Sequence, residues 1–265
     1  MRGRVLIIAG SDSGGGAGIQ ADIKTVSMLD AYAATAITAL TAQNTEGVFG
    51  VLPIPPDFVR RQIEVVLDDI GADVIKTGML HDLPVIEAIA AAWRERAAGV
   101  PLVVDPVMVA KGGARLIDPA AIEGLKHLLI APAEIVTPNL PEAEILCGRA
   151  IGNVDDMRAA GESLLTLGCR SVLVKGGHLS GGTISDVLVT SAGARIWESP
   201  RLSTRHTHGT GCTLASAIAA GLAQGLEVET AVDRARAYVQ RAIASAPGFG
   251  RGHGPLDHSH PLHSN

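Results

Sequence analysis

Short apolar runs alternate along the chain with longer segments of helical spacing. The apolar runs cover residues 5–9, 36–41, 74–77, 102–105, 135–138, 171–175, 184–190 and 195–198. Several are apolar throughout, which is typical of strands that helices cover on both faces. The Ala-rich segments between them cover residues 19–29, 57–69, 84–97, 119–129, 155–167, 210–224 and 228–246. This alternation predicts an α/β fold with three layers, α/β/α, in which helices cover both faces of a mainly parallel central sheet.

No linker divides the chain, and no internal repeat is present. We therefore expect a single domain over residues 1–265. The last two apolar runs are separated only by Ser191, Ala192 and Gly193, which favours a β-hairpin at one edge of the sheet. Residues 248–265 are rich in Gly and His and predict a loosely ordered tail. A metal clip formed by the histidines of this tail is the alternative.

The composition is that of a folded protein, because 47% of the 265 residues are hydrophobic and 18% are charged. The chain has 22 basic and 27 acidic residues and a formal net charge of −5. It has no cluster of Lys and Arg with interleaved aromatic residues, so we expect no nucleic-acid partner. Residues 206–226 carry no charged side chain, but their polar opening favours a buried helix over a membrane span. The apolar run at 5–9 is too short for a signal-peptide core.

The three cysteines, Cys147, Cys169 and Cys212, are odd in number and far apart in sequence. A disulfide framework is therefore not expected, and a reducing compartment such as the cytoplasm is the better interpretation. Cys147 and Cys169 lie in apolar helix-end contexts, which favours inert, packed thiols.

A glycine-rich turn, residues 10–18, follows the first apolar run and leads into a helical segment. Such a turn places backbone N–H groups near a ligand at the carboxyl end of a strand. The glycine spacing does not complete the dinucleotide fingerprint, and no Gly-Lys pair exists to form a P-loop. From the residues alone, a ligand-binding loop and a merely structural turn remain equally open.

A second glycine-rich segment, residues 208–213, opens the uncharged helical segment. Gly209, Thr210 and Gly211 allow the backbone to aim its N–H groups at one point, where the helix dipole adds partial positive charge. This pattern predicts an anion hole. For a phosphoryl group in transfer, each good donor typically lowers the barrier by roughly 2.7–4 kcal/mol. The alternative is a helix start that only packs closely.

Cys212 lies in the first turn of the same helical segment. The helix dipole there is expected to favour the thiolate, relative to an ordinary thiol pKa of about 8.5. A thiolate at this position would accept a proton from an attacking hydroxyl group, so we predict a catalytic role for Cys212. The alternative is an inert core cysteine.

Charged side chains stand at the ends of three further strands. Asp105 closes the run at 102–105, and Glu142 follows the run at 135–138 in a segment that opens a helix. Their hard oxygen ligands suit Mg²⁺, which takes only one or two protein carboxylates and keeps several waters. The alternative for Glu142 is stabilisation of a helix N-terminus. Lys175 ends another strand, where it would meet nucleotide phosphates or simply be solvated.

Together these segments resemble the ribokinase-like superfamily, and within it the hydroxymethylpyrimidine/phosphomethylpyrimidine kinases of thiamine biosynthesis. The resemblance covers nearly the whole chain, and its segments occur in matching order. They are AGSD at 9–12 continuing to GIQAD at 18–22, AQNT at 42–45, KTGML at 76–80, DPVM at 105–108, TPNLPEAE at 137–144, VKGGH at 174–178 and THGTGC at 207–212.

The resemblance implies phosphorylation of 4-amino-5-hydroxymethyl-2-methylpyrimidine, and then of its monophosphate, with ATP and Mg²⁺ as cofactors. It implies that the pyrimidine is bound by Gly10, Asp22, Gln43, Met79 and Val107. It further implies that Asn139 and Glu142 organise Mg²⁺ and phosphates, and that Lys175, Thr204 and Arg236 lie in the nucleotide region. Most ribokinase relatives carry Asp as the base, whereas this chain has Cys212, as the pyrimidine kinases do.

Two other functions compete with this interpretation. A pyridoxal kinase is the alternative within the same class, because a thiol such as Cys212 could form a hemithioacetal with an aldehyde. A non-catalytic ligand-binding module on the same scaffold is the alternative of another class. We also expect a homodimer, because exposed edges of such sheets are often covered by a second subunit.

Overall fold

The computed structural model describes residues 1–109, 116–179 and 181–263. Its strands form one nine-stranded sheet in the order β3-β2-β1-β4-β5-β6-β7-β8-β9. The strands are β1 (Arg4–Asp12), β2 (Tyr32–Gln43), β3 (Val48–Pro53), β4 (Val74–Thr77), β5 (Leu102–Val104), β6 (Ile135–Val136), β7 (Ser171–Lys175), β8 (Thr183–Thr190) and β9 (Gly193–Pro200). Strands β2, β1, β4, β5, β6 and β7 run parallel, whereas β3, β8 and β9 are antiparallel to their neighbours.

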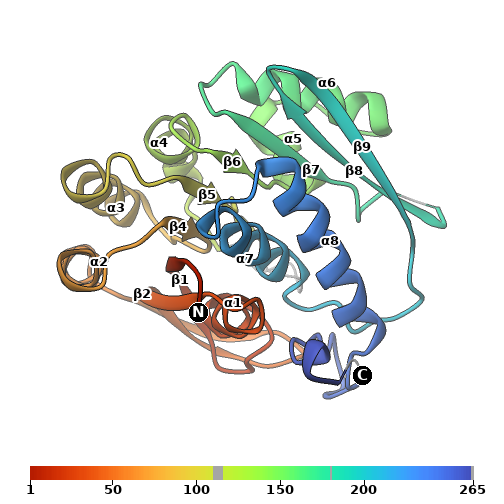
Figure 1. Ribbon diagram of the computed structural model, residues 1–265, viewed down its shortest axis with the longest axis horizontal. Helices are drawn as coiled ribbons and strands as arrows, with labels where there is room; N and C mark the ends of the chain where they lie inside the picture. The colour runs from red at the N-terminus through yellow and green to blue at the C-terminus, as the bar shows by residue number, and fades with distance from the viewer. Residues whose placement is uncertain (110–115, 180, 264–265) are drawn as a thin grey trace.

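Helices cover both faces of this sheet (Figure 1). The helices are α1 (Gly18–Met28), α2 (Pro56–Asp69), α3 (Leu83–Arg96), α4 (Ile122–Leu125), α5 (Leu140–Cys147), α6 (Val154–Leu165), α7 (Thr210–Ala223) and α8 (Val228–Ala244), with short turns η1 (Pro119–Ala121), η2 (Lys126–Ile130) and η3 (His260–His263). Helices α1, α7 and α8 pack on one face, and α2 to α6 pack on the other. The predicted three-layer α/β/α fold is confirmed.

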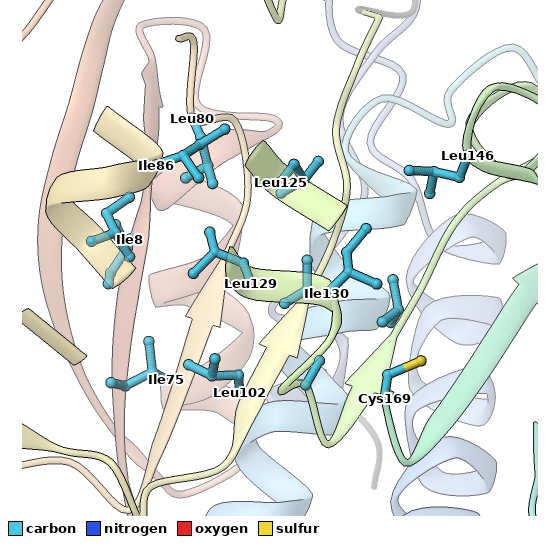
Figure 2. Packing of buried hydrophobic residues seen from close by; sticks show 14 of the residues in the cluster. Ile8, Ile75, Leu80, Ile86, Leu102, Leu125, Leu129, Ile130, Leu146 and Cys169 are labelled. Carbon is cyan, nitrogen blue, oxygen red and sulfur yellow. The ribbon is translucent and has the colours of Figure 1, made fainter. Parts of the chain in front are cut away.

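Alternation of apolar side chains along the parallel strands supplies both cores. In β1, Leu6 and Ile8 face the layer of α2 to α6, while Val5 and Ile7 face α1, α7 and α8. Figure 2 shows Ile8, Ile75 and Leu102 of three adjacent strands packed against the residues of α3, α4 and η2. Because both faces are buried, these strands read as continuous apolar runs in the sequence.

The structure differs from the sequence-based elements in three places. The antiparallel edge strand β3 was not predicted, because its residues are mostly exposed and it is not one of the strands that helices cover on both faces. The segment predicted as a helix at 119–129 is divided into η1, α4 and η2. Helix α5 was predicted only as a helix start. The predicted hairpin is present as β8 and β9.

The chain beyond helix α8 is packed against the rest of the protein as far as residue 263. Leu256, His258 and His260 are buried, and the amide of Asp257 donates to the carbonyl of Ala242 in α8. The prediction of a loosely ordered tail is therefore wrong for this segment, because its apolar and histidine side chains find a buried surface. Within the described residues, no three His, Cys, Asp or Glu side chains are grouped to hold a metal ion, so the histidine clip has no support.

A search of the described ranges for a membrane-crossing helix found none of sufficient length and apolar character. The uncharged segment that follows residue 206 instead forms helix α7, whose residues are mostly buried between the sheet and α8.

Candidate active site

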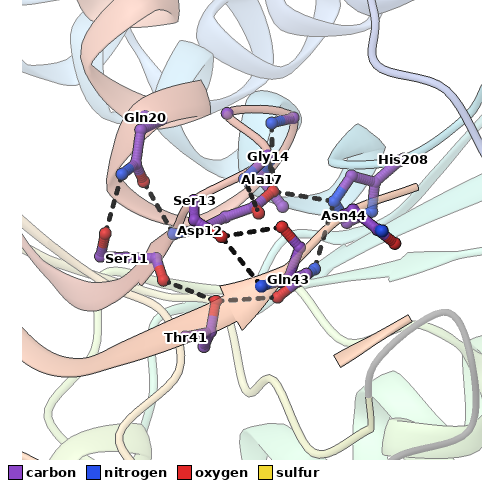
Figure 3. A network of polar contacts seen from close by, with 12 residues as sticks. Ser11, Asp12, Ser13, Gly14, Ala17, Gln20, Thr41, Gln43, Asn44 and His208 are labelled. Carbon is purple, nitrogen blue, oxygen red and sulfur yellow. Dashed lines mark hydrogen bonds and ion pairs between the residues drawn. The ribbon is translucent and has the colours of Figure 1, made fainter. Parts of the chain in front are cut away.

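Asp12 at the end of β1 organises the glycine-rich turn. Its carboxylate accepts hydrogen bonds from the amides of Gly14 at 2.8 Å, Gly16 at 3.1 Å and Ala17 at 2.9 Å. Figure 3 shows these groups gathered around the carboxylate together with His208. Although burial opposes ionisation, the His208 ring and the amide donors hold the pKa of Asp12 below its ordinary value. Three amides that a ligand would need are thus committed to a side chain of the protein.

The segment before α7 forms a second turn, which packs on the first. Gly209 has φ +82°, and a Cβ at this position would collide with the carbonyl of Gly16. Only glycine therefore fits at the helix N-cap. Thr210 is held by a hydrogen bond from its hydroxyl to the carbonyl of Thr207 at 2.8 Å. Because the first amides of a helix have no partner within it, those of Gly211 and Cys212 are available to an anion.

The carboxyl ends of β5, β6 and β7 bring a charged cluster to the same place. Asp105 accepts from the Lys175 ammonium at 2.9 Å and from the Thr137 hydroxyl at 3.1 Å. A Cβ on Gly211 would lie 3.3 Å from the Lys175 nitrogen and 3.7 Å from an Asp105 oxygen. The turn before α7, the lysine and the carboxylate therefore meet at one point, at the edge of the sheet where the parallel strands end.

Glu142 serves first as part of the cap of helix α5. Its carboxylate accepts from the Asn139 amide at 2.9 Å, and the Asn139 side chain accepts from the Glu142 amide at 3.0 Å. Burial, assisted by the charge of Asp105, raises the pKa of Glu142 to about 7 against the opposing effect of Lys175. The capping role of Glu142 is therefore present in the structure, and its role toward Mg²⁺ stays a prediction.

Cys212 lies in the first turn of α7, where it is half-buried. Burial raises the pKa of its thiol to about 12, Asp22 and Asp105 act in the same direction, and Lys76 opposes them. The expectation that the helix dipole favours the thiolate is therefore wrong for the free protein, because loss of hydration outweighs the dipole. Cys169 is buried with a pKa raised to about 11, in keeping with a packed thiol.

Asp22 of helix α1 lies in the interior of the protein, where it forms an ion pair. Its carboxylate is fully buried, pairs with the Lys76 ammonium at 2.8 and 2.9 Å, and accepts from the Ser216 hydroxyl at 2.7 Å. Although burial opposes it, this carboxylate holds the pKa of Lys76 above its ordinary value. The Asp22 carboxylate and the Lys76 ammonium both act electrostatically on Cys212, and the role of Asp22 toward a pyrimidine stays a prediction.

The remaining predicted acceptor residues lie at neighbouring strand ends. Met79 and Gly10 touch, because a Cβ on Gly10 would lie 3.2 Å from the Met79 sulfur. Gln43 ends β2, and its amide lies 3.2 Å from the Thr41 hydroxyl and 3.3 Å from the His208 ring. Val107 follows β5 directly after Asp105 and is partly exposed. Of these residues, Gln43 reaches the turn before α7 through its contact with His208, which precedes Gly209.

Thr204 and Arg236 are engaged with other parts of the protein. The Thr204 hydroxyl accepts from the amide of His206 at 3.1 Å. The Arg236 guanidinium pairs with Asp186 of β8 at 2.8 Å and donates to Ser199 of β9 at 2.7 Å. Arg236 thus ties α8 to the antiparallel edge of the sheet, and its role toward a nucleotide stays a prediction.

Comparison with known proteins identifies the family of this chain. The family model for phosphomethylpyrimidine kinase matches residues 12–257. The chain belongs to this family. The matched range contains every predicted site residue except Gly10, from Asp22 in α1 to Arg236 in α8.

Two relatives and one solved structure illustrate the similarity. The thiamine biosynthesis bifunctional protein ThiED of Geobacter sulfurreducens is 53% identical over 97% of this chain, which spans about half, 52%, of that protein. The hydroxymethylpyrimidine/phosphomethylpyrimidine kinase of Bacillus subtilis is 45% identical over 96% of this chain and 94% of its own length. The ADP complex of Bacillus subtilis pyridoxal kinase has a TM-score of 0.91 and 36% identity, with 100% of both chains covered.

Sequence reasoning missed three residues of this candidate site. Asp12 and His208 were quoted within motifs without a role, yet they join the two glycine-rich turns at 2.9 Å. Lys76 was taken as part of an apolar strand. A fully buried lysine requires a partner of opposite charge. The position of Lys76 inside an apolar strand that helices cover on both faces therefore indicated a buried ion pair.

Proposed function

We propose that this protein transfers the γ-phosphoryl group of ATP to 4-amino-5-hydroxymethyl-2-methylpyrimidine and then to the resulting monophosphate. The main support is the meeting of the Gly211 turn with Lys175 and Asp105 beside the strand ends that carry Gln43 and Met79. The relatives named for this activity are 45% and 53% identical to the chain, whereas the pyridoxal kinase is 36% identical. ADP in that neighbour supports a nucleotide site in this fold.

The charged cluster accounts for phosphate binding. Lys175 offers a cation, and the amides at Gly211 and Cys212 offer donors to the oxygens of the group in transfer. Asp105 and Glu142 are buried oxygen ligands that both act on Lys175, a donor set suited to a hard cation that also takes phosphate and water. Mg²⁺ held there would neutralise charge on the phosphates. We assign Asn139 to this site through its cap on Glu142 and keep Thr204 and Arg236 as candidate nucleotide contacts.

In the transfer, a bond forms between the hydroxyl oxygen of the acceptor and the γ-phosphorus, and the bond between the γ-phosphorus and the leaving ADP oxygen breaks. A base must accept the proton of the acceptor hydroxyl. We assign Cys212 to the acceptor hydroxyl as the group that takes this proton. The thiol must first lose its own proton to water, and the Lys76 ammonium is the charge in the protein that favours this loss. A largely dissociative transition state makes late proton removal tolerable.

Gly10, Gln43, Met79 and Val107 are assigned to the acceptor. Gln43 offers both a donor and an acceptor to an aminopyrimidine edge, while Met79 and Val107 offer apolar contact. Asp22 is assigned an indirect part through Lys76. The pyridoxal alternative is favoured by the close structural match to a pyridoxal kinase and by a thiol able to add to an aldehyde.

The assay for both activities is release of ADP from Mg·ATP with three acceptors, the hydroxymethylpyrimidine, its monophosphate and pyridoxal. We expect kcat/KM to favour the pyrimidines by about tenfold or more, the scale set by a few polar contacts. A preference for pyridoxal would assign a pyridoxal kinase. No ADP release with any acceptor would favour a non-catalytic binding module.

We also propose a homodimer in the cytoplasm. The edge strand β3 and the start of α2 expose Phe49, Leu52 and Phe58, by 71%, 62% and 60%. An apolar edge of this kind invites a second subunit. The described cysteines are free, which suits a reducing compartment. Light scattering of the parent protein and of Phe49→Glu measures the oligomeric state, and an unchanged monomer in both would reject the dimer.

A further inference from the structure

His208 connects three parts of the proposed site. Its Nε2 lies 2.9 Å from a carboxylate oxygen of Asp12 and 3.3 Å from the terminal amide atom of Gln43, which is placed as nitrogen. The next residue is Gly209, at the start of the anion-binding turn. The ring is largely buried, with 13% of the side chain exposed. Figure 3 shows the imidazole between the Asp12 carboxylate and the Gln43 amide.

The proton on Nε2 can be assigned from its neighbours. The Asp12 carboxylate already accepts three amide hydrogen bonds, and such donors favour the ionised form. An ionised carboxylate can only accept, so Nε2 must carry a proton and donate it to Asp12. The assignment is the same for a neutral ring and for a cationic ring, because both carry hydrogen on Nε2.

This proton determines which terminal atom of Gln43 faces the ring. An Nε2–H group does not accept a hydrogen bond, so its amide neighbour at 3.3 Å has to be the oxygen. Amide oxygen and nitrogen have nearly the same shape, so hydrogen-bond partners decide between them. The proton on His208 Nε2 therefore favours the orientation in which the terminal amide of Gln43 is rotated by half a turn, so that its oxygen and nitrogen exchange places.

Thr41 gives the same orientation independently. Its hydroxyl lies 2.9 Å from the main-chain carbonyl of Ser11, which can only accept, so the hydroxyl proton points there. The Thr41 oxygen can then only accept from Gln43 at 3.2 Å, which requires the amide nitrogen on that side. With the oxygen toward His208 and the nitrogen toward Thr41, the single Nε2 proton of His208 donates to Asp12 and is shared with the Gln43 oxygen, and the Gln43 NH₂ group donates to Thr41.

We propose that Asp12 and His208 are positioning residues that fix the Gln43 amide with its oxygen toward His208 and its NH₂ group toward Thr41. Gln43 then presents its acceptor on the side of the phosphate-binding turn and its free N–H on the side of β2. An acceptor molecule with adjacent amine and ring nitrogen can pair with it in one register only. The statement about the acceptor molecule rests on the proposed function, whereas the orientation of the amide does not.

The first test measures the tautomer in the free protein. Long-range ¹H–¹⁵N correlation of ¹⁵N-histidine-labelled protein reports which ring nitrogen carries hydrogen, and loss of the signal in His208→Gln assigns it. We expect His208 with hydrogen on Nε2, and a ring with hydrogen on Nδ1 alone would overturn the proposal. No substrate is present, so this outcome is independent of whether the protein is a pyrimidine kinase.

The second test separates positioning from a general structural role. His208→Leu should raise KM for the pyrimidine by about tenfold, the equivalent of one lost hydrogen bond, with KM for ATP changed less than about twofold. His208→Gln keeps an N–H donor and should restore most of the loss. In a Gln43→Ala background, His208→Leu should add less than about twofold, because the group it positions is gone; a full tenfold effect there would overturn the proposal.

Two further variants keep this test interpretable. Thr41→Val removes the acceptor on the other side of the amide and should also raise KM for the pyrimidine, and an unchanged KM would contradict the orientation even where His208→Leu does not fold. Glu46→Gln breaks an exposed ion pair with Arg251 near the same turn and should change neither KM.

Discussion

The two glycine-rich turns of this protein look alike in sequence and differ in what their amides do. In residues 10–18 the amides of Gly14, Gly16 and Ala17 point at the buried carboxylate of Asp12. Beside the Gly209–Gly211 turn the nearest carboxylate, Asp105, is paired with Lys175 and does not accept the amides of the turn in the described part of the chain. A glycine-rich loop is therefore available to an anion only where its amides do not already donate to a carboxylate of the protein.

Of the substitutions that test this difference between the two turns, Gly209→Ala should lower kcat the most. The side chain would collide with the Gly16 carbonyl and strain a backbone at φ +82°, so the two turns would separate. We expect kcat to fall on the order of 10²–10³, the loss found for one misplaced oxyanion donor. Steady-state ADP release measures it. Gly148→Ala is the matched control, since Gly148 also has a positive φ, +69°, but open space around its Cβ.

Cys212→Ala should have the next largest effect. It removes the proposed proton acceptor and leaves Gln43 and the anion-binding amides in place, so kcat should fall about 10²-fold while the pyrimidine Kd is retained. Titration calorimetry with the pyrimidine and kcat from ADP release separate the two effects. An unchanged kcat would reject Cys212 as the base.

Gly211→Ala should reduce kcat less, by about tenfold. Its added methyl group would lie 3.3 Å from the Lys175 nitrogen, which belongs to a flexible side chain and can shift. The effect therefore comes from displacement of a cation rather than from backbone strain, and KM for ATP should rise with it. Gly99→Ala, in open space, serves as the control. Kinetic parameters equal to those of the parent would show that the anion hole lies elsewhere.

Asp12→Asn should have the smallest effect on turnover and a clear effect on stability. Loss of the charge weakens the hydrogen bonds from three amides, one of them buried, which costs about 1–3 kcal/mol in the free energy of unfolding. Because the pKa of Asp12 is lowered in the folded state, this stabilisation is present above the unfolded pKa and is lost as the pH falls through the folded pKa. Urea unfolding of parent and variant should therefore differ at pH 7 and converge in acid.

The fold was predictable because both faces of the parallel strands are buried and the runs are continuously apolar. The Asp105 and Glu142 positions were predictable because strand ends in such sheets meet at one edge. The protonation state of the Cys212 thiol was not predictable, because its pKa depends on hydration and on Asp22 and Asp105, which are far away in sequence. The roles of Asp12 and Lys76 were missed for the same reason, because their partners lie 196 and 54 residues away.

These separations bear on the order in which the molecule folds. Asp12 meets His208 across 196 residues, and Asp22 meets Ser216 across 194. Closing such long loops has an entropic cost that local helices and neighbouring strands do not carry. Refolding chains are therefore expected to regain their helical circular dichroism before they regain turnover.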